Sequence, residues 1–309
     1  MEPWVFITVA AALAQTFRFM LQKWLTLAGL SAGGATFARF LFSAPLAILV
    51  VCLYSEGSDQ GIPSMPERFW KFAIAGGVAQ ILATMCVVSI FSHRNFAVGI
   101  TFKKTEVVMT AVAGFLILGE GVGVVGGIAI GLGLLGVLLI SDPPAGTGPP
   151  IRRIVNRATG LGIVNRATGL GLASGMFFAV SAVGYRGASL ALESGDTALR
   201  AGTTLAVVTT FQTIALAIWL MWRERGQITR VLRAWRVTGM VGLASMIGSF
   251  CWFSAFTLQN AAYVSALGQI ELIFSIAAST LFFRERVSPR EYGGIALLTA
   301  GILVLVLFL

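Results

Sequence analysis

Charged side chains interrupt several apolar stretches that are otherwise long enough to cross a membrane. Seven such residues occur in the sequence, five basic and two acidic: Arg18, Arg39, Lys103, Lys104, Arg186, Glu106 and Glu271. A charge at membrane depth costs roughly 2.5–3.5 kcal/mol on insertion scales, so these residues normally face a cavity or a charged partner. The excess of cations predicts a positively charged site that binds an anionic group.

The spacing of polar residues in the first apolar stretch suggests a site-lining face. Gln15, Arg18 and Gln22 fall within about 60° of one another on a helix, so they form a polar stripe on an otherwise apolar segment. We expect this stripe to line the cavity of a membrane protein.

Lys103 and Glu106 are three residues apart, which is close enough for their side chains to pair on a helix. Such a pair would leave Lys104 or Arg18 as the cation without a counterion. The unpaired cation is where an anionic group could bind.

The remaining candidates each have a structural interpretation beside the functional one. Glu106 and Glu271 either belong to a site, where a buried carboxylate can take up and release a proton, or hold lysine and backbone partners that fix helix packing. Tyr185 and Trp252 either stack on a ligand or fill the core. Arg39 and Arg186 are expected to extend toward a membrane interface.

Several kinds of chemistry find no support in the sequence. It contains no GxxxxGK[ST] phosphate loop, no HExxH motif and a single histidine, His93, so we expect neither a catalytic residue nor a cofactor. The three cysteines lie in apolar runs without metal-ligand spacing, so we expect neither a metal site nor a disulfide. The net charge of +9 lies in short loops beside apolar spans, which favours membrane orientation over nucleic-acid binding.

The composition requires a membrane-embedded chain. Only 35 of 309 residues (22 Lys and Arg, 13 Asp and Glu) are charged, or 11%, where a soluble chain would carry about a quarter. Hydrophobic residues make up 57%, and the mean hydropathy is +0.87. The apolar stretches lack the alternating pattern of a membrane barrel, which predicts an all-α polytopic protein of about ten transmembrane helices.

Hydropathy and turn signals divide the chain into two five-helix units, residues 1–140 and 168–309, joined by a polar linker at 141–167. The expected helices lie near 4–27, 35–54, 69–92, 96–118, 121–140, 168–190, 199–222, 237–257, 261–283 and 291–309.

The two units carry an internal repeat at an offset of 165 residues. Between positions 68 and 122, 14 of 55 residues are identical to their counterparts, and the matches include Glu106 with Glu271 and Glu120 with Glu285. Because each unit has an odd number of spans, the second must enter the membrane from the opposite side. The pattern predicts an inverted repeat with a substrate site between the halves.

With these features the chain resembles the drug/metabolite transporter superfamily, and specifically the bacterial EamA-like proteins. The resemblance rests on the two five-helix halves and on two matching stretches, Asn95 to Glu120 and Asn260 to Glu285, the second of which contains Gln269 beside Glu271. It implies a ten-helix secondary transporter in the bacterial inner membrane, with a central cavity lined by helices 1, 3, 4, 6, 8 and 9. The family carries amino acids, sugars, nucleotides and drugs.

Glycines and loop charges bear on assembly and orientation. Gly119, Gly123, Gly127 and Gly131 recur every four residues, a small face that serves close packing within the bundle or, second, a homodimer. Most loop Lys and Arg residues follow the odd-numbered helices, which predicts that these loops face the cytoplasm and both termini face outward. A C-terminal reporter active only in the cytoplasm would contradict this orientation.

The leading hypothesis is therefore a secondary transporter, working as an exporter, of a small amino-acid-like or anionic metabolite. Its partners would be that substrate, membrane lipids and, if a glutamate couples transport, protons. We expect substrate binding by Gln15, Arg18, Gln22, Lys103, Lys104, Tyr185, Trp252 and Gln269, and coupling by Glu106 and Glu271. The alternatives are a membrane-embedded enzyme or lipid-handling protein, and a cationic-drug pump.

Overall fold

The computed structural model describes residues 2–58, 61–90, 103–140, 166–274, 276–277 and 289–308, and within these ranges it is helical without strands. The helices are α1 (Pro3–Leu27), α2 (Ala32–Gly57), α3 (Glu67–Ile90), α5 (Glu106–Leu118), α6 (Val124–Ile140), α8 (Arg166–Ala191), α9 (Thr197–Arg223), α10 (Gln227–Arg233), α11 (Trp235–Leu258), α12 (Ala261–Leu267), the 3₁₀ turn η1 (Gly268–Ile270) and α14 (Pro289–Phe308).

The described helices make a multi-pass membrane protein. Five of them are long and apolar enough to cross a membrane: α1, α2, α3, α9 and α11. Shorter apolar helices cover Glu106–Leu118, Val124–Leu139, Ala261–Phe274 and Tyr292–Phe308. Large apolar side chains such as Trp24, Leu53 and Ile218 are exposed on the outside of the bundle, where lipid can cover them.

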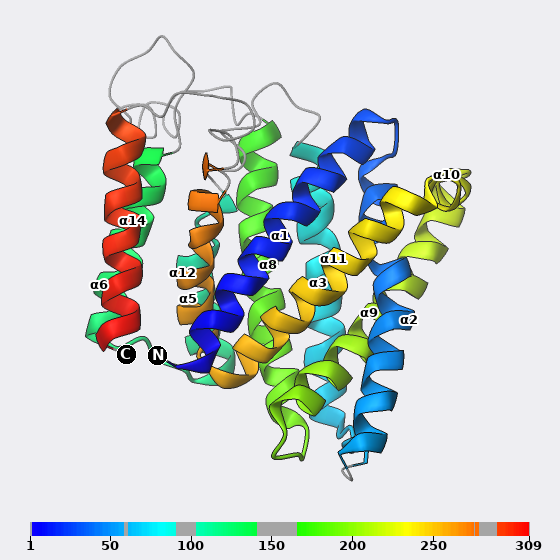
Figure 1. The fold of residues 1–309 in the computed structure, drawn as a ribbon, viewed down its shortest axis with the longest axis horizontal. Coiled ribbons are helices and arrows are strands. Elements are labelled where there is room, and N and C mark those ends of the chain that lie inside the picture. The colour runs from blue at the N-terminus through cyan, green and yellow to red at the C-terminus, as the bar shows by residue number, and fades with distance from the viewer. Residues whose placement is uncertain are drawn as a thin grey trace.

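The two halves of the chain interlock instead of standing side by side. The most extensive helix contacts pair α3 with α8, α6 with α14, α1 with α11 and α2 with α9, and each pair joins the first half to the second. In Figure 1, α1 and α11 cross in front of α8 and α3, and the α6–α14 pair stands at one side. The chain enters α1 and leaves α14 at the same end of the bundle.

The expected helix bounds agree with the described ones to within a few residues, because long apolar runs mark the spans. Three features differ. The loop after α9 contains the short helix α10, the helix expected at 96–118 is interrupted by a turn at 104–105, and the helix expected at 261–283 is interrupted by the 3₁₀ turn η1. The start of the helix expected at 96–118, most of the linker, His93, Asn95 and Glu285 lie outside the described residues.

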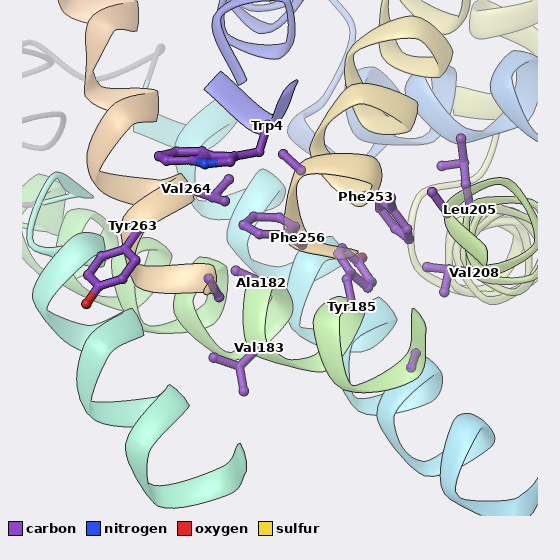
Figure 2. Close-up of a cluster of buried hydrophobic side chains, with 14 of the residues drawn as sticks. Trp4, Ala182, Val183, Tyr185, Leu205, Val208, Phe253, Phe256, Tyr263 and Val264 are labelled. Carbon is purple, nitrogen blue, oxygen red and sulfur yellow. The ribbon is translucent and has the colours of Figure 1, made fainter. Parts of the chain in front are cut away.

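A buried apolar cluster joins the two halves, and several of its members also line the pocket described below. It brings Trp4 of α1 together with Tyr185 of α8, Phe253 and Phe256 of α11, and Val264 of α12 (Figure 2). Tyr185 stacks on Phe253 with 4.2 Å between ring centroids. These aromatic side chains fix the angle between α8 and α11, the two helices of the second half that carry much of the pocket described below.

The glycine face of α6 differs from the expected one. Added Cβ atoms at Gly127 and Gly131 would meet nothing within 4 Å, whereas one at Gly136 would lie 2.6 Å from the carbonyl oxygen of Gly294 on α14. A Cβ added at Gly301 of α14 would likewise lie 2.8 Å from the carbonyl oxygen of Ala129 on α6. The close packing within the bundle therefore uses another face of α6 than the four-residue stripe. A homodimer through the four-residue stripe remains an untested prediction.

Close approach of α3 and α8 depends on a glycine pair, which makes a testable prediction. A Cβ at Gly184 would lie 2.8 Å from the Cα of Gly76 and 3.1 Å from the carbonyl oxygen of Phe72, both backbone atoms. We expect Gly184→Ala to destabilise the protein by about 1–3 kcal/mol, because the helices must separate. Melting of the purified protein should show this loss, whereas Gly127→Ala, with open space around it, should melt like the parent. Equal melting of the two variants would contradict the close contact.

Candidate functional site

Two breaks in the helical backbone lie at corresponding positions of the two halves. Residues 104–105 form a turn immediately before α5, and residues 268–270 form the turn η1 after α12. At the repeat offset of 165, positions 103–105 correspond to 268–270, and each break is followed by a glutamate, Glu106 or Glu271. Interrupted helices of this kind form substrate and ion sites in many transporters built from repeats.

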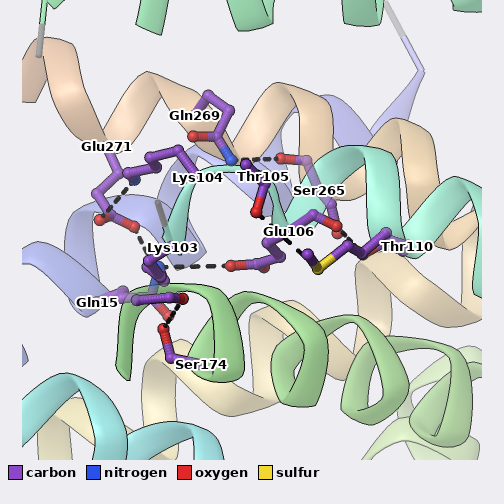
Figure 3. A network of polar contacts seen from close by, with 12 residues as sticks. Gln15, Lys103, Lys104, Thr105, Glu106, Thr110, Ser174, Ser265, Gln269 and Glu271 are labelled. Carbon is purple, nitrogen blue, oxygen red and sulfur yellow. Dashed lines mark hydrogen bonds and ion pairs between the residues drawn. The ribbon is translucent and has the colours of Figure 1, made fainter. Parts of the chain in front are cut away.

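The charged residues at these breaks form two ion pairs, one within the first half and one between the halves (Figure 3). Lys103 Nζ lies 3.5 Å from Glu106 Oε2, which confirms the pair expected from their spacing. Lys104 Nζ lies 3.1 Å from Glu271 Oε1, and Gln15 Nε2 donates to Glu271 Oε2 at 2.6 Å. Glu271 therefore ties α1 and the start of α5 to the broken helix of the second half.

A pocket opens beside this network, between the two halves of the chain. The empty space between its walls amounts to about 570 Å³, part of it open to solvent. Its lining residues are Gln15, Arg39, Gln80, Lys103, Glu106, Phe178, Ser181, Ala182, Tyr185, Ser249, Trp252, Phe253, Phe256, Ser265, Gly268, Gln269 and Glu271. Both halves contribute polar groups, and aromatic rings from α8 and α11 form an apolar wall.

Some buried polar atoms of the pocket residues have no hydrogen-bond partner among the described residues. They are Trp252 Nε1, Ser265 Oγ and Gln269 Oε1, one donor, one hydroxyl and one acceptor. Gln269 uses its amide nitrogen on the carbonyl oxygen of Ser265 at 3.3 Å, which leaves the amide oxygen for another group. Leaving such atoms unpaired costs stability, so they favour a site that a ligand or water completes.

The polar stripe on α1 divides between the pocket and the packing behind it. Gln15 lines the pocket, whereas Arg18 and Gln22 are buried without lining it. Gln22 donates to the carbonyl oxygen of Ala35 at 3.0 Å and so connects α1 to α2. Arg18 contacts Gln15 Oε1 at 3.4 Å, its Nε has no partner, and no described carboxylate lies within 4.0 Å of it.

The two arginines that were expected to extend toward an interface differ in their surroundings. Arg39 is 3% exposed and donates to Thr84 Oγ1 at 3.0 Å and Ser249 Oγ at 3.2 Å, so it lies inside the bundle. Arg186 pairs with Glu120, from its Nε to Oε1 at 2.6 Å and Oε2 at 2.8 Å. This ion pair joins α8 to a residue just after the end of α5, and it neutralises Arg186.

A second polar network includes the pocket residues Tyr185 and Gln80. Tyr185 Oη donates to Gln80 Oε1 at 2.7 Å, and Gln212 Nε2 donates to the same oxygen at 3.1 Å. Tyr185 thus lines the pocket with its ring while its hydroxyl is already used. Trp252 stacks on Phe256, with 5.6 Å between centroids.

Sequence reasoning did not place Arg39, Gln80, Ser181 or Ser249 in the site. Their common signal is a polar side chain within an apolar span, which also fits residues that only connect helices. A site residue differs from a residue that only connects helices in which helices surround it. That arrangement depends on tertiary packing and cannot be derived from the sequence of one segment.

Comparison with known proteins adds a fold and a family. A search of curated proteins finds no match. Among solved structures, 28 chains match, and one crystal structure aligns with a TM-score of 0.69 and 13% identity, over 99% of this chain and 96% of that chain. At that identity the likeness shows a shared fold. The sequence model of the EamA-like transporter family matches residues 2–142 and again residues 166–307. With both of its halves matched, the chain belongs to the EamA-like transporter family.

Proposed function

We propose that this protein is a secondary active transporter that exports a small amino-acid-like or anionic metabolite across the bacterial inner membrane. Ten transmembrane helices in two inverted repeats, residues 1–140 and 168–309, would alternate access to a site between them. The arginine-rich end of the bundle would face the cytoplasm, and protons would be the coupling ion. A transporter of this kind needs no ATP-binding loop, and the sequence contains none.

The observation that carries this proposal is the pocket between the halves, bordered by two broken helices at equivalent positions. Its polar walls come from α1, α2, α3 and the start of α5 on one side, and from α8, α11 and the broken α12 segment on the other. A change in the packing of one half against the other would change the exposure of every one of these walls. Alternating access by relative motion of the repeats requires a site whose exposure changes in this way.

The sign of the charge favours an anionic substrate. Within the pocket lining, Arg39 and Lys103 balance Glu106 and Glu271. The buried cations Arg18 and Lys104 do not line the pocket, but they lie close enough to these groups to interact with them electrostatically. The site therefore has four cations and two carboxylates, namely Arg18, Arg39, Lys103 and Lys104 against Glu106 and Glu271. An ammonium group would be accepted only where a glutamate is free to meet it.

A ligand panel tests the charge preference. Anionic, zwitterionic, neutral and cationic solutes of matched size would be titrated against the purified protein, with melting temperature as the readout. A ligand at 100 times its dissociation constant adds about 2.7 kcal/mol of stability. We expect anions and zwitterions to raise the melting temperature and cations to leave it unchanged.

Substitution of Arg18 sharpens this test, because Arg18 adds charge without lining the pocket. We expect Arg18→Gln to weaken anion binding roughly tenfold through the lost field. Arg230, which is exposed and donates to the carbonyl oxygen of Gly29, provides the control: Arg230→Gln should leave binding unchanged. A clear preference of the parent for cations would contradict the proposal and favour a drug pump. Chemical conversion of a bound solute would instead favour the enzyme or lipid-handling alternative.

A further inference from the structure

Arg39 is a buried cation at the pocket whose hydrogen-bond partners among the described residues are neutral. It lies on α2, and its guanidinium donates from Nη1 to Thr84 on α3 and from Nη2 to Ser249 on α11. The two hydroxyls come from different halves of the chain, so they hold the plane of the guanidinium in position relative to both halves. Hydroxyls orient an arginine without neutralising it.

The charge of Arg39 is not met by any carboxylate within 4.0 Å in the described part of the chain. The described ion pairs use Lys71 with Glu67, Lys103 with Glu106, Lys104 with Glu271 and Arg186 with Glu120. Arg18 lies close enough to Arg39 to repel it, which increases the local positive potential. A buried cation without a counterion is costly, and an arriving anion would remove that cost.

The donors around Arg39 suit a carboxylate. Arg39 Nε makes no hydrogen bond with a described residue, so this N–H and the remaining hydrogens of the Nη groups are available. Gln80 accepts from Tyr185 and Gln212 with its amide oxygen, which fixes the amide and leaves its NH₂ as a donor at the pocket. These donors are the free N–H groups of one guanidinium and one amide NH₂, and they carry a single positive charge. They therefore match the planar, singly charged carboxylate better than a doubly charged phosphate.

We propose that Arg39 anchors the carboxylate of the transported solute, with Gln80 donating a second hydrogen bond and Thr84 and Ser249 holding the guanidinium in place. This inference rests on the proposed transport function and specifies its substrate class as carboxylate-bearing small solutes. It assigns a substrate contact to α2, a helix that the resemblance to the family did not include among those lining the cavity.

The test compares carboxylates with their uncharged amides. Acetate and acetamide, N-acetyl-L-leucine and N-acetyl-L-leucinamide, and phenylacetate and phenylacetamide would be titrated into the purified full-length protein, together with a phosphate monoester. We expect the parent to prefer at least one carboxylate over its amide. We expect Arg39→Gln to reduce that preference by about 10- to 100-fold while amide affinity stays unchanged, since a hydrogen bond to a charged group is lost.

Further variants separate binding from structure. Arg39→Lys keeps the charge without the planar fork and should recover part of the preference. Thr84→Val and Ser249→Ala loosen the guanidinium while retaining it, so their effect should be smaller than that of Arg39→Gln. Arg230→Gln, on an exposed loop helix, should bind all probes as the parent does.

Each contrary outcome points to a different failure. If Arg39→Gln keeps the carboxylate preference and Arg18→Gln loses it, the transport proposal holds and Arg39 is not the anchor. If Arg39→Gln weakens carboxylates and amides equally and lowers the melting temperature, Arg39 is a structural link between helices, and the inference is wrong. A preference for the phosphate monoester that Arg39→Gln abolishes would contradict the assignment to carboxylates. If the parent prefers neither a carboxylate nor the phosphate monoester, the anionic substrate of the proposed function fails as well.

Discussion

Glu271→Gln is expected to abolish gradient-driven uptake in reconstituted vesicles while leaving substrate exchange at equal concentrations intact. Glu271 lies at a helix break, lines the pocket and meets both Lys104 and Gln15. A carboxylate in this position can give up its lysine contact when it takes a proton, which would link proton movement to the arrangement of the two halves. Glutamine keeps the shape of the side chain but cannot carry the proton.

Glu106→Gln gives the matched experiment in the other half, because Glu106 occupies the equivalent position and pairs with Lys103. Glu67→Gln is the control, since Glu67 is 82% exposed and pairs with Lys71 on the helix surface. Uphill transport that persists in both Glu271→Gln and Glu106→Gln would rule out proton coupling through these residues. A parallel loss of exchange, uphill transport and melting temperature would show that the glutamates serve packing.

The second large effect concerns the buried pair of Lys104 and Glu271. Lys104→Met should destabilise the protein by about 3–5 kcal/mol, because Glu271 would remain buried without its lysine. Adding Glu271→Gln to Lys104→Met removes the second charge as well and should recover most of the lost stability. Melting temperatures of the single and double variants measure this recovery.

The double variant also separates stability from function. We expect Lys104→Met with Glu271→Gln to melt close to the parent and still fail in gradient-driven transport. A double variant less stable than either single variant would contradict the pairing, because independent sites would then add their losses.

Hydropathy and the internal repeat predicted much of the fold. The spans were found because lipid demands long apolar segments with internally satisfied backbones. The repeat also placed Glu106 and Glu271 at equivalent positions, and both follow breaks in the helix. The breaks themselves left no common local signal, since residues 103–105 read Lys-Lys-Thr and residues 268–270 read Gly-Gln-Ile.

The contacts of the site were less predictable, because they join residues far apart in the chain. Spacing within one helix predicted the pair of Lys103 and Glu106, whereas Lys104 finds its partner 167 positions away. Arg39 was expected to extend toward an interface, as long basic side chains in apolar spans commonly do. Its burial follows from the packing of α3 and α11 around α2, which no single segment of sequence reveals.

The most direct test of the central claim is solute counterflow in vesicles containing only this protein. Vesicles would be loaded with a high concentration of an unlabelled carboxylate from the binding panel and diluted into a trace of the labelled form. A transporter with a single alternating site accumulates label transiently above its outside concentration, and we expect this overshoot for the parent and its reduction in Arg39→Gln. Label that never exceeds the outside concentration, or that is recovered as a different compound, would contradict transport as the function of this protein.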